Sequence, residues 1–192
     1  MKLDPQNRWL TRMPLRRLEA EAIRDAMLSI SRQLKKGPIE AGVMPYLTSY
    51  MSGRGRPSTS GPLDGDGRRS IYLSVRRNFL PPLFASFDFP TPFTAIGKRS
   101  VSNIPAQSLA LMNDPLVKEQ AQHWALVIIK KQPSLEARID VMYESAFSRN
   151  PTADEKTIAL HFVQEQSSTD EKKAWTELAH ALFCSKEFIF VP

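Results

Sequence analysis

Arginine residues gather in one short stretch of this chain, and arginine is the side chain best suited to bind oxyanions. A guanidinium group presents a fixed fork of N–H donors that matches the oxygen atoms of carboxylate, sulfate and phosphate groups. Between Ser52 and Phe79 only Asp64 and Asp66 oppose these positive charges, and glycines and prolines set the spacing. The stretch therefore predicts a multi-point anion receptor, to which Lys98 can add charge. The candidate anion- or partner-binding residues are Arg99, which lies beyond this stretch, and the six arginines within it: Arg54, Arg56, Arg68, Arg69, Arg76 and Arg77.

A second interpretation of the same arginines is structural. The carbonyl groups of an irregular, partly buried segment need hydrogen-bond donors, and arginine side chains can supply them. The arginines would then hold the segment on acidic groups of neighbouring helices and leave no ligand site. The sequence alone keeps both interpretations open.

Nucleic acid is a further candidate partner, because Gly53-Arg-Gly-Arg-Pro57 resembles the core of an AT-hook. In that motif an extended Arg-Gly-Arg segment lies in the narrow minor groove of A·T-rich DNA. The usual leading proline and flanking basic residues are missing here, and acidic residues follow. DNA is therefore the weakest of the candidate partners.

The residues Asp64-Gly-Asp-Gly67 begin like a calcium-binding loop. An EF-hand would also need an acidic residue near position 75, where Val75 stands, so the calcium motif fails. We expect a tight turn instead, with Asp64 paired to Arg68 or Arg69.

No motif identifies a reaction or a bound metal. His180 and Cys184 lie four residues apart, as do His161 and Glu165, yet neither pair has a second pair at metal-ligand spacing. Cys184 is the only cysteine, which excludes an internal disulfide and a Cys-x-x-Cys-His haem attachment, so we expect no cofactor. The sequence has no Gly-x-Ser-x-Gly elbow, no His-Glu-x-x-His pair and no phosphate loop. An enzyme remains an alternative, because paired carboxylates can be distant in sequence.

The composition suits one domain of 192 residues, of which 42% are hydrophobic, enough to bury a core. Residues 1–103 hold 17 Lys and Arg against 8 Asp and Glu, whereas residues 104–192 hold 9 against 12. A polyanionic partner would therefore meet the first half. No apolar run approaches the roughly 20 residues that cross a bilayer, and no signal peptide is recognisable at the start.

Recurring apolar residues predict a long amphipathic helix over residues 14–36. Pro14 suits its first turn, Arg17 and Glu21 are expected to pair at i,i+4, and Gly37-Pro38 is expected to end it. The expected buried stripe consists of Leu15, Leu18, Ala22, Ile23, Ala26, Met27, Ile30 and Leu34.

Residues 37–104 are expected to be irregular, because glycines and prolines recur there. Ile71, Leu73 and Val75 alternate with more polar residues, which predicts a short strand. Residues 83–87 are long enough for one or two helical turns.

Residues 105–192 predict a bundle of four or five helices with short connections, which implies antiparallel neighbours. The second helix of this bundle should bury Val117, Ala121, Trp124, Ala125 and Ile128. The fold class is mainly α, with one or two short strands in the irregular segment. The helix starts are marked by Pro105, Asp114-Pro115, Pro133-Ser134, Pro151-Thr152 with Glu155 at capping-box spacing, and a position near residue 170.

Several long strings of this sequence are distinctive: residues 16–27, 61–72, 75–80, 87–92 (Phe-Asp-Phe-Pro-Thr-Pro), 102–109 (Ser-Asn-Ile-Pro-Ala-Gln-Ser-Leu) and 112–115. These strings resemble a planctomycete family, the C-terminal domain PSD1, also called domain of unknown function 1553. The tail, residues 181–191, is also similar to the family's end.

This resemblance implies a context more than an activity. Family members are typically the C-terminal part of long exported proteins that carry a cytochrome c-like domain, which suggests an extracytoplasmic setting and a chain that is part of a longer protein. The resemblance supplies no catalytic residues. The leading hypothesis is a non-catalytic binding or assembly module whose arginine-bearing loop docks sibling domains or an anionic glycan. The competing hypothesis is a hydrolase or lyase that acts on anionic polysaccharide.

Overall fold

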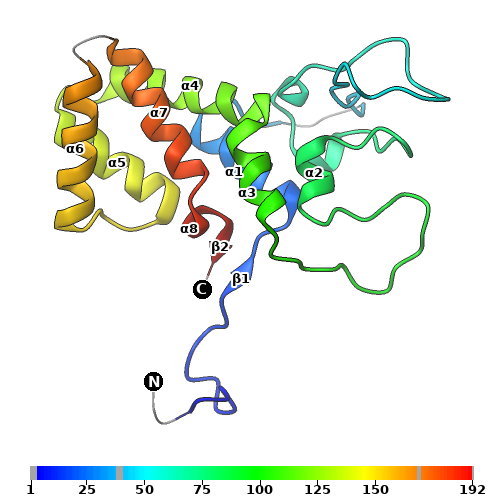
Figure 1. Ribbon diagram of the computed structural model, residues 1–192, viewed down its shortest axis with the longest axis horizontal. Coiled ribbons are helices and arrows are strands. Elements are labelled where there is room, and N and C mark those ends of the chain that lie inside the picture. The colour runs from blue at the N-terminus through cyan, green and yellow to red at the C-terminus, as the bar shows by residue number, and fades with distance from the viewer. Residues whose placement is uncertain (1–3, 38–40, 168–169, 192) are drawn as a thin grey trace.

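A computed structural model describes residues 4–37, 41–167 and 170–191. This part of the chain is mainly α, as predicted, with eight α-helices, two short 3-10 turns and one two-stranded antiparallel sheet (Figure 1). None of its helices is both long and apolar enough to cross a bilayer. The helices are α1 (Ala20–Ile30), α2 (Pro82–Ser86), α3 (Pro105–Asn113), α4 (Pro115–Lys131), α5 (Leu135–Phe147), α6 (Ala153–Ser167), α7 (Glu171–Phe183) and α8 (Lys186–Ile189). The strands are β1 (Arg16–Arg17) and β2 (Phe190–Val191), and the 3-10 turns are η1 (Gly65–Gly67) and η2 (Ser70–Tyr72).

The helices α4 to α7 form one half of the molecule, with α4 and α7 packed against each other along their lengths (Figure 1). Trp124 of α4 stacks on Phe183 of α7 with ring centroids 4.9 Å apart, and both rings are fully buried. The predicted buried stripe of α4 is confirmed. Apolar burial therefore holds this half together.

The predicted helix starts in the bundle are also confirmed. Asp114 accepts a hydrogen bond from the Leu116 amide at 2.9 Å, and Pro115 opens α4. Thr152 and Glu155 form a reciprocal capping box, with N···O distances of 2.8 and 3.3 Å. These caps need only residues close in sequence, which is why the sequence identifies them.

The first helix is shorter than predicted, because α1 spans Ala20–Ile30 rather than 14–36. Arg16 and Arg17 instead form strand β1, which pairs with Val191 and Phe190 of β2 near the C-terminus. The residues before α1 are therefore in a sheet and not in a helix. The helix ends because Arg32 adopts φ 62°, well before Gly37; Pro38 lies outside the described residues.

The buried face of α1 also differs from the predicted stripe. It consists of Ala20, Ile23, Arg24, Met27 and Leu28, whereas the predicted members Leu15 and Ala22 are exposed. A charged residue therefore lies on the inward face of this helix.

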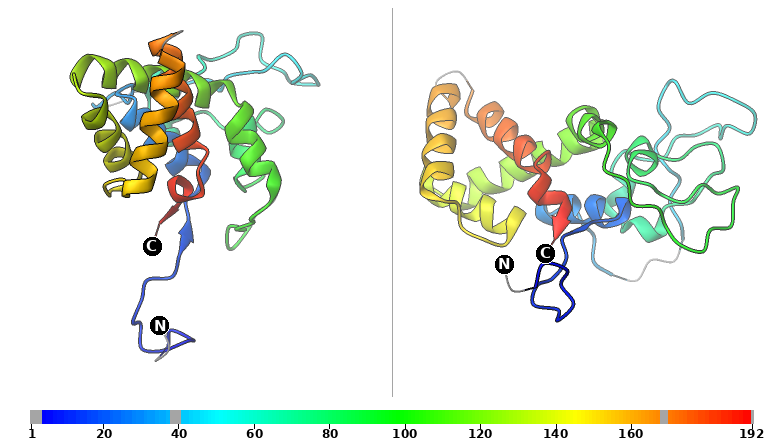
Figure 2. Two further views of the ribbon diagram at one scale, coloured as in Figure 1. Left: turned by 60° about the vertical axis from the view of Figure 1, so that its left-hand side comes forward. Right: turned by 60° about the horizontal axis from the view of Figure 1, so that its bottom comes forward.

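Residues 41–104 are largely irregular, as predicted, and extend from α1 on the side opposite the bundle (Figures 1 and 2). The short helix α2 at residues 83–87 is confirmed with a shift of one residue. The strand predicted around Ile71 is wrong: residues 70–72 form a 3-10 turn, and Leu73 alone makes an isolated parallel bridge, to Val43. The turn forms because Arg24 and Asp25 of α1 hydrogen-bond to Ser70, as described below.

Candidate functional site

Arg24 of α1 is the centre of a polar cluster that fixes the irregular segment. Its side chain is only 3% exposed. Its guanidinium donates to the carbonyl oxygens of Asp64 at 2.5 Å and Arg68 at 2.9 Å, and to Ser70 Oγ at 3.0 Å. One helix residue thus satisfies backbone groups 40 and 44 positions away in the chain.

Asp25, the next residue, completes this cluster. One of its carboxylate oxygens accepts from the Ser70 amide at 2.8 Å and from Ser70 Oγ at 2.7 Å. Because both groups of Ser70 are engaged, the chain turns here instead of extending as a strand. We call Arg24, Asp25, Asp64, Arg68 and Ser70 the loop clamp.

Both positions in Asp64-Gly-Asp-Gly67 that carry glycine lack room for a side chain, because Arg24 lies close to Gly65 and the Gln33 carbonyl lies close to Gly67. Gly65 and Gly67 have φ of 61° and 67°, and a Cβ on Gly65 would collide with the Arg24 guanidinium. The side chain of Asp64 accepts from the Asp66 amide at 3.0 Å. The predicted tight turn is therefore present, in 3-10 form.

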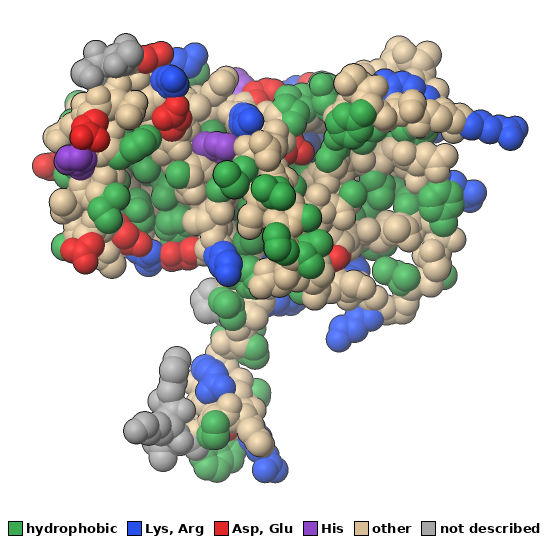
Figure 3. All heavy atoms as spheres, in the orientation of Figure 1, with side chains coloured by type: hydrophobic (Ala, Val, Ile, Leu, Met, Phe, Trp, Pro, Cys, Tyr) green, Lys and Arg blue, Asp and Glu red, His purple; other side chains and the backbone are tan. Residues whose placement is uncertain are grey.

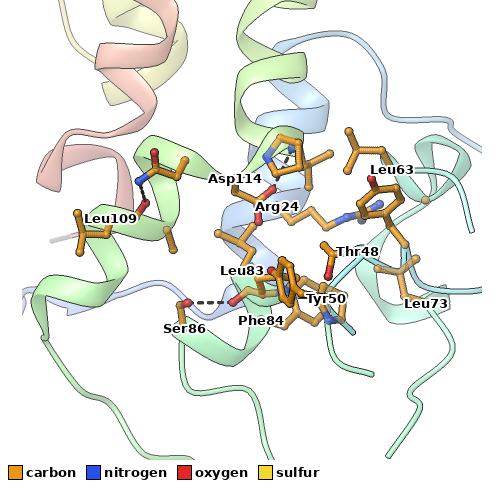
Figure 4. A pocket seen from close by; sticks show the side chains of 18 of the residues that line it. Arg24, Thr48, Tyr50, Leu63, Leu73, Leu83, Phe84, Ser86, Leu109 and Asp114 are labelled. Atoms are coloured by element: carbon orange, nitrogen blue, oxygen red, sulfur yellow. Dashed lines mark hydrogen bonds between the residues drawn. The ribbon is translucent and has the colours of Figure 1, made fainter. Parts of the chain in front are cut away.

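An apolar cavity of about 630 Å³ lies beside the loop clamp, between residues 46–63, α2 and α3 (Figure 4). That size is within the usual range for small-ligand sites. Leu73, Leu83, Phe84 and Leu109 supply much of its wall, and Arg24 closes one side. Tyr50 and Leu109 stand at its rim, with 70% and 57% of their surface exposed.

Two oxygen-bearing side chains on the cavity wall retain capacity for a ligand. The hydrogen bond that caps α4 engages only Oδ1 of Asp114, and burial raises the pKa of this carboxyl. Thr48 Oγ1 is buried and has no hydrogen-bond partner in the described part of the chain. The cavity therefore combines an apolar body with a carboxylate and a hydroxyl.

None of the seven predicted site arginines lines this cavity. Arg68 belongs to the loop clamp, where it donates to the Ala41 carbonyl and lies 3.5 Å from Asp66. Arg69 lies 3.6 Å from Asp25. The expected pairing of Asp64 with Arg68 or Arg69 is wrong, because the Asp64 side chain caps its own turn while Asp66 pairs with Lys35 at 2.5 Å.

The remaining predicted arginines face different surroundings. Arg56 donates to the Thr48 carbonyl at 3.3 Å, Arg76 to the Met44 sulfur at 3.3 Å, and Arg77 lies over the Phe93 ring. Arg54 is exposed and has no hydrogen bond or ion pair with another described residue. Figure 3 shows Lys and Arg side chains at separate points along this half of the molecule, not in one group. Anion binding by these residues stays a prediction.

Arg99 ties the long connection between α2 and α3 back to α1. It lies 2.7 Å from Glu21 and 3.0 Å from Glu19, and these carboxylates raise its pKa. The predicted pairing of Glu21 with Arg17 is therefore wrong: Arg17 is buried and bonds Asp88 at 2.6 Å. Arg17 and Glu21, both in the family-like string 16–27, thus each hold a residue of the segment that follows α2.

Asp88 also closes the base of the connection between α2 and α3. Its carboxylate accepts from the Ser102 amide at 2.8 Å and from Ser102 Oγ at 2.9 Å, and Gln107 donates to that hydroxyl at 3.0 Å. The motifs at residues 87–92 and 102–109 therefore meet in space. We call this pairing of Asp88 with Ser102 the loop clasp.

The smaller motifs have local partners. Residues 53–56 form a turn closed by the Arg56 amide and the Gly53 carbonyl, 3.2 Å apart, and not the extended form of an AT-hook. His180 contacts the Leu111 carbonyl at 3.1 Å, and His161 lies 3.4 Å from Glu165. No group of three or more potential metal-ligating side chains occurs within the described ranges.

The sequence analysis missed Arg24, Asp25 and the cavity. A signal for Arg24 existed: it is a charged residue on the inward side of an apolar helix pattern, next to Ile23. The cavity had no comparable signal, because its walls come from several segments that lie far apart in the sequence.

The fold and this geometry define a mainly helical module with a clamped irregular segment and an apolar cavity. The chain belongs to the PSD1 family, described as protein of unknown function (DUF1553), whose family model matches residues 1–163. The match includes the loop clamp, the loop clasp and the cavity, whereas α7 and the tail at 181–191 lie outside it. No curated protein and no solved structure matches the chain.

Proposed function

We propose that this protein is a non-catalytic assembly module that binds apolar and aromatic side chains of a protein partner in the cavity beside the loop clamp. The observation that carries the proposal is the cavity of about 630 Å³ with a mainly apolar wall. Tyr50 and Leu109 at the rim extend this apolar surface outward. Burying an aromatic side chain in such a site is favourable, because its apolar area leaves water.

The arginines serve a different purpose in this proposal. Arg24, Arg68 and Arg99 hold the irregular segment that forms the cavity, through the contacts described above. Their donors are largely occupied by carbonyl and carboxylate groups of the chain itself. A sulfated or phosphorylated ligand would have to compete with these partners.

Catalysis on polysaccharide has less support. Hydrolysis of a glycoside normally uses a pair of carboxyl groups on either side of the bond. Asp114 is the single acidic side chain among the described residues that line the cavity, and it already caps α4. The proposal therefore assigns Asp114 to binding.

The test is NMR chemical-shift mapping of the labelled protein with a neutral aromatic probe, N-acetyl-tryptophanamide. We expect amide shifts confined to residues 46–50, α2 and α3. Ala106→Phe places a ring in the cavity wall and should abolish the shifts. Ser108→Phe places the same ring on an exposed part of α3 that does not line the cavity, and should leave the shifts intact.

A different result would overturn the proposal. If the probe shifts no residue of α3, the cavity does not bind aromatic groups. If instead a sulfated oligosaccharide binds, and binding is lost in the double variant Arg76→Ala with Arg77→Ala, the arginine-bearing loop is the functional surface.

A further inference from the structure

The N-terminal arm, residues 4–15, stands apart from the rest of the molecule. Figures 1 and 2 show it projecting from the helical body beyond β1. The pairing of β1 with β2 fixes its base, with Leu18 N also bonded to the Ile189 carbonyl at 2.8 Å. The arm is thus anchored to the body at its β1 end.

Residues 4–12 of the arm make hydrogen bonds with one another. The Asp4 carboxylate accepts from the amides of Arg8 at 2.8 Å and Trp9 at 2.9 Å. Arg12 donates to the carbonyls of Asp4 at 3.0 Å and Pro5 at 2.9 Å. These contacts close residues 4–12 into a compact turn, which we call the knob.

The knob presents large apolar side chains to solvent. Trp9 is 75% and Leu10 82% exposed, whereas the other two tryptophans, Trp124 and Trp175, are buried. Tryptophan is enriched among the residues that dominate binding energies at protein interfaces. A segment already held in one conformation also loses less entropy on binding. The knob therefore has the physical character of a docking element.

We propose that the knob of one copy inserts Trp9 and Leu10 into the cavity of a second copy. This inference rests on the proposed function of the cavity and names its occupant. Figure 1 shows the arm pointing away from α2 and α3 of its own chain. The knob would therefore enter the cavity of a second molecule and not that of its own chain. Two such contacts related by a twofold axis give a closed dimer.

One residue on each surface, Arg8 on the knob and Asp114 on the cavity wall, carries a charge complementary to the other. Arg8 precedes Trp9 on the knob, and its guanidinium has no ion pair with any described residue. Asp114 on the cavity wall keeps one carboxylate oxygen outside its capping bond. Burial raises the pKa of Asp114, so an incoming guanidinium would favour its charged form.

The first test is the concentration dependence of the full chain's mass and fluorescence. Analytical ultracentrifugation should show a monomer–dimer equilibrium, and the emission of Trp9 should shift to shorter wavelength as the dimer forms. Trp9→Ala should weaken association by at least about 30-fold, the loss expected for a central interface residue. Asp114→Asn retains an N-cap residue and should weaken association several-fold.

The second test is complementation between two defective variants. Trp9→Ala lacks the knob side chain but has a free cavity, whereas Ala106→Phe has the knob but a filled cavity. Each alone should be monomeric, and a mixture should form a one-to-one complex through one intact contact. The control Ser108→Phe should dimerise like the wild type.

A wild-type protein that stays monomeric, with Trp9 emission independent of concentration, would overturn the inference. So would a Trp9→Ala protein that still dimerises, or a mixture that does not associate. Binding of N-acetyl-tryptophanamide to the Trp9→Ala monomer separates the two proposals. If the probe binds to Trp9→Ala while the wild type is monomeric, only the inference of a second copy fails. If the probe does not bind, the function proposed for the cavity fails as well.

Discussion

The two halves of this molecule both bury apolar side chains, including Leu83, Phe84 and Phe87 of residues 41–104, but they differ in the polar contacts that add to this burial. In the bundle, α4 and α7 bury Trp124, Trp175 and Phe183 against each other. In the irregular segment, 41–104, charged and polar side chains bond the backbone: Arg24 donates to two carbonyls, and the loop clasp joins residues 14 positions apart. Apolar contacts tolerate small adjustments, whereas a polar clamp loses its contribution when one partner is removed. We therefore expect the bundle to unfold as one cooperative unit, and the irregular segment to open locally when a clamp residue is changed.

The largest expected effect is in the bundle. Trp124→Ala should reduce the free energy of unfolding by about 3–5 kcal/mol, because it removes a buried ring and leaves a cavity. Urea unfolding followed by circular dichroism measures this loss. Leu126→Ala, on the exposed side of the same helix, is the matched control and should cost less than about 1 kcal/mol. Equal costs for the two variants would contradict the buried position of Trp124.

A smaller and more local effect is expected at the loop clamp. Arg24→Met should cost about 3 kcal/mol, because it removes a buried charged donor and leaves the partly buried carbonyls of Asp64 and Arg68 without it. Hydrogen exchange should rise first in residues 61–75 and remain slow in α4 and α7. Arg54→Met removes the same charge from an exposed site, and it should change neither the free energy of unfolding nor the hydrogen exchange of residues 61–75. Uniform loss of protection in all helices would show that the two halves are not separable.

The loop clasp should be weaker still. Ser102→Ala removes the hydroxyl that bridges Asp88 and Gln107, and should cost about 1–2 kcal/mol. Limited proteolysis should then cut faster between residues 89 and 101. Ser108→Ala is the control, because Ser108 is exposed. Identical cleavage rates in the two variants would argue against a clasp.

The smallest effect concerns a partly exposed ion pair in the bundle, between Arg149 and Glu155. Hydrogen bonds from Arg149, and then from Thr152, lower the pKa of Glu155 to about 2 from an ordinary 4.5. A lowered folded-state pKa stabilises the protein above pH 4.5, and this contribution is lost as the pH falls toward 2. Because solvent screens the pair, it should be worth about 1 kcal/mol or less. The melting temperature of wild type should exceed that of Glu155→Gln at pH 7 and converge with it near pH 2; a constant difference would contradict the assignment.

The bundle was predictable because its signals are local. Pro105, Asp114 and Thr152 mark helix starts through groups within a few residues, and the period of apolar residues identifies the inward face. The irregular segment was predicted only as irregular. The strand expected around Ile71 failed because α1 holds Ser70 in a turn, a contact between residues 45 positions apart.

The candidate site was predictable in part. The predicted site arginines do include two that fix loops, namely Arg68 and Arg99, but the most deeply buried cation of the clamp, Arg24, was not among them. Anion binding by the exposed arginines Arg54, Arg76 and Arg77 remains a prediction. The cavity has no signature in the sequence, because it is a gap between segments and not a property of any one of them.

The sequence by itself determined a mainly helical chain, its family and the caps of its bundle, because propensity, periodicity and capping act over a few residues. Tertiary structure alone decided where α1 begins, which arginine closes the clamp, and that an apolar cavity lies beside it. Each of these depends on pairing between distant residues: β1 with the C-terminal β2, Arg24 with the carbonyl of Asp64, and α3 with residues 46–50. Such pairings are selected by the free energy of the whole packed chain, which no short window of sequence contains.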